Sequence, residues 1–92
     1  MIKNFKHRGL KRLYEKDDPR QLQRNHVDKI SRILARLVEA PEVAHMDVPG
    51  FRLHPLSGDL RGFWSVAVRS NWRVIFRFDG SHAFDVDLVD YH

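Results

Sequence analysis

The feature that most constrains the fold is a change of hydrophobic period near Phe51. Before it, apolar residues recur every three or four positions, which predicts an amphipathic helix over 21–40. After it, apolar residues alternate with polar ones over 63–69, 72–78 and 83–89, as in half-buried strands joined by short turns. Helices followed by a run of strands predict an α+β fold, with the helices packed on one face of an antiparallel sheet.

Shorter patterns complete the predicted order of elements. Residues 2–5 form an apolar start that is typical of an edge strand, and 7–15 form a short amphipathic helix that ends at the Asp17-Asp18-Pro19 turn. Pro41 ends the long helix, and residues 51–54 form a short strand that stops at Pro55. We therefore predict one domain over 1–92, in the order strand, helix, helix and a four-stranded antiparallel meander.

The alternation in the three longer strands also predicts which face each residue occupies. Even-numbered residues such as Trp64, Val74 and Phe84 carry most of the large apolar side chains, so they should share the face toward the helices. The opposite face then carries the odd-numbered residues, and we expect it to be charged. On that face Arg73 and Arg77 should lie across from Asp85 and Asp87.

The charge is divided unevenly along the chain. Residues 1–36 hold eleven Lys or Arg and four Asp or Glu, a net of +7, whereas residues 37–92 have a net of −3. A basic half suggests a surface for a polyanion, although a solvated helix face explains the charge equally well. There is no cysteine, and no apolar run approaches a signal peptide or a membrane span, which favours a cytoplasmic protein without a membrane partner.

Metal chemistry has weak support in the sequence. The six histidines include no HxH or HExxH spacing, so we expect neither a metal site nor a cofactor. RNA, in contrast, carries its own nucleophile in the 2′-hydroxyl group. A protein that cleaves it needs one proton acceptor, one proton donor and a cation that stabilises the charge on the phosphate. Histidine, with an ordinary pKa of about 6.5, and arginine suit these tasks.

The chain offers such groups at the ends of predicted strands, namely His54, Arg73, Asp90 and His92. Each of them also has a structural interpretation. His54 is explained as a partly buried strand residue, Arg73 as an ion-pair partner of Asp87, and the final residues as a frayed tail. The alternating pattern continues to Val89, however, and this favours a tail held close to the sheet.

A resemblance strengthens the catalytic interpretation. The stretch LHPLSGDLRGFWSVAVRSNWRVIFRF, the opening MIKNFKHRGLKRLYEK and the ending VDYH closely resemble the HigB toxins of the RelE superfamily. The likeness runs over essentially the whole chain. It implies a microbial-ribonuclease-like fold and a ribosome-dependent endoribonuclease that cuts messenger RNA in the decoding site of the small subunit. It also implies a helix-turn-helix antitoxin, HigA, as partner, so that operator DNA is reached only through the antitoxin.

The resemblance also implies roles for individual residues. It assigns catalysis to His54, Asp90, Tyr91 and His92, and phosphate binding to Arg73. Our hypothesis is that Asp90 or His54 takes the 2′-proton, His92 protonates the leaving oxygen, and Tyr91 stacks on or orients a base.

Ser57 departs from the family, which often has lysine after LHPL; the next basic residue is Arg61. This departure leaves the activity level and the codon preference open. We expect further RNA or ribosome contacts from residues that are basic or belong to the NWR motif: Lys11, Arg12, Arg24, Lys29, Arg32, Arg61 and Asn71.

Two other functions stay open at this point. One is a non-catalytic member of the superfamily, such as a ParE-like poison of DNA gyrase, since a shared fold does not fix the activity. The other is a decayed toxin that only binds its antitoxin. The set of His54, Asp90, Tyr91 and His92 favours the nuclease, because a gyrase poison would not need it.

Overall fold

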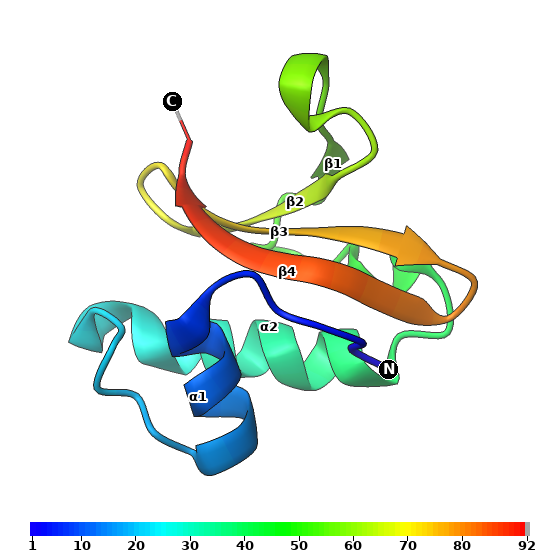
Figure 1. Ribbon diagram of the computed structural model, residues 1–92. Coiled ribbons are helices and arrows are strands. Elements are labelled where there is room, and N and C mark those ends of the chain that lie inside the picture. The colour runs from blue at the N-terminus through cyan, green and yellow to red at the C-terminus, as the bar shows by residue number, and fades with distance from the viewer. Residues whose placement is uncertain (92) are drawn as a thin grey trace.

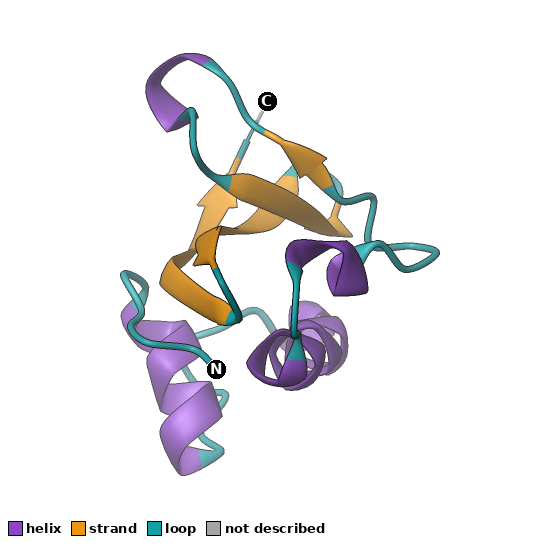
Figure 2. Ribbon diagram, turned by 90° about the vertical axis from the view of Figure 1, so that its right-hand side faces the viewer, coloured by secondary structure: helices purple, strands orange, loops and turns teal. Residues whose placement is uncertain are grey.

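The computed structural model describes residues 1–91 and has helices on one face of an antiparallel sheet (Figures 1 and 2). The helices are α1 (Arg8–Lys16) and α2 (Val27–Glu39), with short 3₁₀ turns η1 (Arg24–His26), η2 (Val43–Met46) and η3 (Gly58–Leu60). The strands are β1 (His54–Pro55), β2 (Trp64–Arg69), β3 (Trp72–Asp79) and β4 (His82–Asp90). Their order in the sheet is β1-β2-β3-β4. The α+β prediction is confirmed, and neither helix of the described residues is long and apolar enough to cross a membrane.

The long helix begins later than predicted. We expected it from Gln21, but α2 starts at Val27 and is preceded by η1. Leu22 is the only apolar residue from 20 to 26, so the apolar stripe of α2 does not continue through these residues. The short helix α1 is within one residue of its prediction, and His7 caps it by accepting a hydrogen bond from the backbone N–H of Leu10 at 3.3 Å.

Asp18 fixes the turn that follows α1. Its carboxylate accepts hydrogen bonds from the side chain of Arg20 at 2.9 Å and from Arg12 at 3.1 Å. The hydrogen bonds from the Arg20 side chain and backbone, followed by that from Arg12, hold the pKa of Asp18 well below its usual range. The turn is therefore stabilised by a charge that persists into acid.

This gives a pH-dependent prediction for stability. A carboxyl group whose pKa is lowered by folding stabilises the protein above its unfolded pKa, and that contribution is lost as the pH falls. Asp18→Asn should lower the melting temperature slightly at pH 7, since the site is close to solvent. Thermal denaturation should show the difference from the parent chain shrinking below about pH 4. A difference of equal size at pH 7 and pH 2 would contradict an electrostatic origin.

The prediction that even-numbered residues face the helices holds in β2 and β3 but is wrong at Phe84 in β4. The main core includes Val66, Val74 and Phe76, yet in β4 it includes Ala83 and Val86. The pairing with β3 shifts between Ile75 and Arg77, and Asp85 has a left-handed φ of 52°. This is a β-bulge, which moves the side chains on one side of it to the opposite face.

The segment before α1 holds this bulge in place. Asn4 donates to the Asp85 carboxylate at 2.7 Å and accepts from the Asp85 backbone N–H at 3.0 Å. The predicted edge strand over residues 2–5 is present only as two parallel bridges, Ile2 to Ala83 and Phe5 to Val86. Figure 1 shows this segment running along β4, where it covers the edge of the sheet.

The face of the sheet away from the helices is less charged than predicted. The loop between β1 and β2 folds over it, so that Leu56 and Phe63 pack on Ile75 in a second small apolar cluster. Arg77 lies over the Phe63 ring at 4.4 Å and pairs with Asp85 at 3.4 Å. We call this face of the sheet the outer face. Among its described residues, the predicted pairing of arginine with aspartate is reduced to this one ion pair.

Candidate functional site

The first strand differs from its prediction in a way that positions His54. We expected a strand over 51–54 that stops at Pro55, but β1 consists of His54 and Pro55 themselves. Arg52 interrupts the extended chain because its backbone is left-handed, with φ 54°. Pro55 fits because β1 lies at the edge of the sheet, where one side of the strand needs no ladder hydrogen bond.

His54 and Arg73 lie on the outer face. His54 is directly across from Ser65, and Arg73 is directly across from Ala67. Residues directly opposite each other share a face, and Ser65 is itself opposite Ile75 of the outer cluster. Standard strand spacings put the Cα atoms of His54 and Arg73 about 12 Å apart. Two long side chains at that separation can approach one phosphate group from two sides.

The carbonyl group of Arg52 determines which nitrogen of the neutral His54 ring carries the proton. The Nδ1 atom of His54 lies 3.1 Å from the carbonyl oxygen of Arg52. A carbonyl oxygen only accepts, so Nδ1 carries a proton and donates it in this hydrogen bond. In the neutral ring, Nε2 then keeps its lone pair. His54 is thus arranged as a proton acceptor at Nε2.

Arg73 is half-buried, and its Nε atom is buried without a hydrogen-bond partner. Its strand neighbour in β4 is Val89, so the predicted ion pair with Asp87 is wrong; Asp87 lies opposite Ile75 instead.

The Nζ atom of Lys29 donates to the carbonyl of Gly50 at 2.7 Å. Burial lowers the pKa of Lys29, and the charges of Arg32 and Arg73 lower it further. Several positive charges therefore gather at this end of the sheet.

The end of β4 lies beside the turn that leads into Arg73. Asp90 is opposite Trp72, and the backbone N–H of Tyr91 donates to the carbonyl of Asn71 at 2.8 Å. The prediction of a tail held near the sheet is confirmed as far as Tyr91, whose side chain is exposed. By register Asp90 follows Trp72 on the helix side, at the rim of the sheet. His92, predicted to be catalytic, lies outside the described residues.

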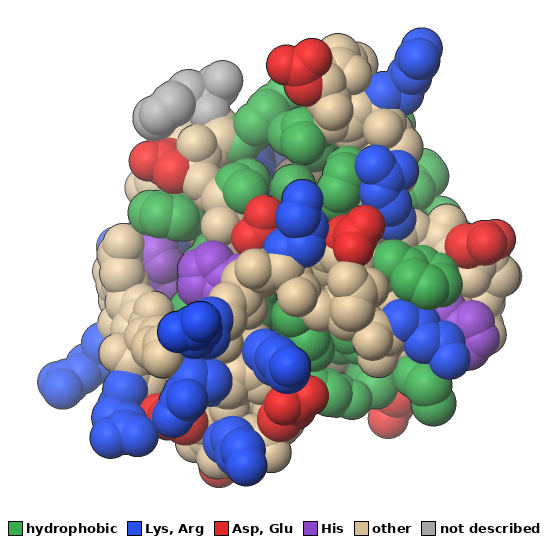
Figure 3. Space-filling view, in the orientation of Figure 1, with side chains coloured by type: hydrophobic (Ala, Val, Ile, Leu, Met, Phe, Trp, Pro, Cys, Tyr) green, Lys and Arg blue, Asp and Glu red, His purple; other side chains and the backbone are tan. Residues whose placement is uncertain are grey.

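The predicted RNA-contacting residues fall into different places. Lys11, Arg24 and Arg32 are exposed on or beside the helices, and Arg61 and Asn71 are exposed in the loops around the outer face. Arg12 is paired with Asp18, so its charge is already engaged in the turn after α1. In Figure 3, basic side chains gather toward the lower left, where Figure 1 places α1 and the start of α2. The helices therefore carry a second basic surface, which comes near Arg73 at Lys29.

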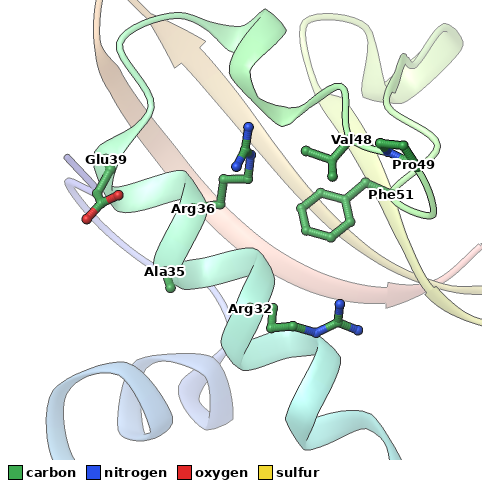
Figure 4. Close-up of a pocket in the computed structure, with 7 residues that line it drawn as sticks. All are labelled: Arg32, Ala35, Arg36, Glu39, Val48, Pro49 and Phe51. Atoms are coloured by element: carbon green, nitrogen blue, oxygen red, sulfur yellow. The ribbon is translucent and has the colours of Figure 1, made fainter.

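A groove of about 400 Å³ lies between α2 and the 48–51 loop (Figure 4). Arg32 and Arg36 project from the helix beside Val48 and Phe51. Arg36 also donates to the carbonyl of His45 at 2.7 Å. The groove contains Arg32 but none of the residues to which we assign chemistry, so it is not the catalytic site.

Two residues of the site escaped sequence reasoning. Ser65 is completely buried between His54 and Ile75, although its place in the alternation is that of an ordinary outward-facing polar residue. Arg52 gave no signal, because left-handed backbone is expected of glycine or asparagine rather than arginine. Within residues 1–91, no group of three His, Asp or Glu side chains is placed to hold a metal ion.

Comparisons with known proteins agree with this architecture. The model of a family described as the RelE-like toxin of the type II toxin–antitoxin system HigB matches residues 3–92. The chain is 41% identical to the endoribonuclease HigB of Proteus vulgaris, over all of both chains. The solved YoeB–YefM complex of Staphylococcus aureus superposes with a TM-score of 0.64 at 17% identity, covering 100% of this chain and 95% of the other. A YoeB/ParE toxin of Agrobacterium tumefaciens gives 0.52 at 21% identity, covering 79% and 80%.

Proposed function

This chain belongs to the HigB-like family of RelE-like toxins and is a toxin–antitoxin endoribonuclease, and we propose that it cuts messenger RNA on the ribosome without a catalytic metal ion. The observation that carries the mechanism is the shared placement of His54 and Arg73 on the outer face, with Nε2 of His54 left as a proton acceptor. We propose a single toxin domain over residues 1–92.

The proposed reaction uses the substrate's own 2′-hydroxyl group. Its oxygen attacks the adjacent phosphorus while its proton passes to Nε2 of His54, and the bond from phosphorus to the 5′-oxygen breaks. Arg73 binds the phosphate oxygens as negative charge develops on them. His92 returns a proton to the 5′-oxygen, Asp90 orients a proton-transfer group at the rim and Tyr91 stacks on a base. The products are a 2′,3′-cyclic phosphate and a free 5′-hydroxyl group.

The proposed partners follow from the family and the charge. A toxin of a type II system has an antitoxin, and we propose one of the HigA type, with a helix-turn-helix domain. The basic surface of α1 and α2, with Arg61 and Asn71 near the outer face, would bind ribosomal RNA and message, so binding should weaken steeply with salt. We propose the cytoplasm as its location, because translated messages are found there.

Ribosome dependence is tested by comparing one message in free and ribosome-bound form. We expect cleavage on purified ribosomes to be at least tenfold faster, because the ribosome holds a flexible strand in one geometry. The measurement is the rate of appearance of ends that carry 2′,3′-cyclic phosphate. Equal rates with and without ribosomes would contradict the prediction. A requirement for added zinc or manganese would contradict the metal-free mechanism, and gyrase inhibition without cleavage would favour the ParE-like function.

A further inference from the structure

Ser65 has a hydroxyl group with no visible purpose in the fold. The residue is fully buried in β2, and its Oγ atom has no hydrogen-bond partner. A buried hydroxyl left unpaired destabilises a protein, and alanine would fill the position without that penalty. An unsatisfied polar group at such a place calls for a role outside folding, and Ser65 stands directly across from His54.

A second unsatisfied group lies nearby on the same face. The Nε atom of Arg73 is buried and has no partner either. Arg73 is opposite Ala67, which is two residues from Ser65, so Ser65 and Arg73 are diagonal neighbours on adjacent strands. Diagonal neighbours lie within reach of a long side chain. The two groups are complementary, because Nε–H only donates and a hydroxyl oxygen can accept.

The burial of Nε limits what can bind it. A phosphate that arrives from solvent meets the terminal nitrogens of the guanidinium group first, since Nε itself is covered. Neutral His54 does not donate to the serine oxygen, because its one N–H, at Nδ1, is already bonded to the carbonyl of Arg52. The hydroxyl oxygen of Ser65 is thus the nearby acceptor on the outer face that has no hydrogen-bond partner.

We propose that Ser65 is a positioning residue for Arg73 during cleavage, an inference that rests on the proposed function. When the two terminal nitrogens of Arg73 bind the scissile phosphate, its Nε–H donates to Oγ of Ser65. This hydrogen bond fixes the guanidinium plane against the strand, so that both terminal nitrogens face the phosphate oxygens. Ser65 itself touches neither the substrate nor a transferred proton.

A double-mutant cycle tests the coupling. Ser65→Ala should lower the cleavage rate at saturating ribosomes about tenfold, as expected for a lost hydrogen bond to a charged group, with little change in KM. Arg73→Lys keeps the charge but lacks both Nε–H and the planar fork. In the Arg73→Lys background, Ser65→Ala should therefore have no further effect. The melting temperature of Ser65→Ala should equal or exceed that of the parent chain, and Ser31→Ala on α2 is the control.

Several results would overturn the proposal. Full activity of Ser65→Ala would overturn the role of Ser65. The proposed function would still hold if the parent chain cleaves RNA. A tenfold loss in the Arg73→Lys background would also overturn the positioning role, because Ser65 would then act without Nε. The hydrogen bond can also be followed without cleavage. The measurement is the ¹⁵N-detected NMR signal of the Arg73 Nε–H group during titration with inorganic phosphate. It should shift in the parent chain and change less in Ser65→Ala, and identical shifts would count against the hydrogen bond.

Discussion

Replacing Arg73 with alanine is expected to lower the rate of RNA cleavage by about 10²-fold or more, as the loss of a contact to the developing charge does. Stability should be preserved. Arg73 is only half-buried, lies opposite Val89 and has a buried Nε without a partner. Removing such a group relieves an unsatisfied donor instead of breaking an ion pair. Rate measurements on ribosome-bound message and thermal denaturation of the same preparations check both parts.

Arg77 provides a matched control for this substitution. It lies four residues further along β3 on the same face, but its guanidinium group is engaged by Asp85 and the Phe63 ring. Arg77→Ala should therefore affect stability modestly and cleavage little. If Arg73→Ala unfolds the protein, or if the two substitutions reduce cleavage equally, Arg73 has a structural role and the phosphate-binding assignment is wrong.

The difference between Arg73 and Arg77 shows where sequence patterns reached their limit. Both lie at odd positions of β3, and alternation predicted the same acidic surroundings for both. In the folded sheet Arg73 is opposite Val89, whereas Arg77 lies beside the bulge at Asp85 and pairs with that carboxylate. A bulge depends on a single residue in left-handed backbone, here fixed by Asn4, more than eighty positions away. Local periodicity contains no information about such a contact.

The helices and the order of strands were predictable for the opposite reason. The stripe that includes Ile30, Ile33 and Leu37 repeats over several turns, and all three side chains are fully buried. Signals of that length survive small local irregularities. The cover of the outer face by Leu56 and Phe63 was not foreseen, because both lie at the ends of a loop without a period.

The candidate site divides in the same way. His54 and Arg73 could be proposed from the sequence because their side chains suit phosphate chemistry, and the structure places both on one face. Arg52 and Ser65 were not found, because their contributions are a backbone carbonyl and a buried hydroxyl. Neither contribution depends on a residue type that marks chemistry in a sequence.

Replacing His54 with alanine is expected to lower cleavage by about 10²–10⁴-fold, the range for loss of a general base. The fold should tolerate the change, since His54 is only partly buried and lies in a two-residue edge strand. The pH–rate profile should lose the limb that rises as the imidazole loses its proton. Because alanine leaves space at the site, imidazole added to the solution should occupy the place of the missing ring and restore part of the rate. His45→Ala, a substitution of another partly buried histidine, should leave rate and pH profile unchanged.

The hydrogen bond to Arg52 makes the role of His54 separately testable. ¹⁵N spectra of the neutral ring should show the proton on Nδ1, since the carbonyl oxygen cannot donate. Arg52→Gly keeps the carbonyl and favours left-handed backbone, so it should preserve this tautomer and most of the activity. A proton on Nε2, or a pH profile that is unaltered in His54→Ala and insensitive to imidazole, would remove His54 as the base. Proton transfer from the 2′-hydroxyl would then fall to Asp90, the other candidate at the rim of the sheet.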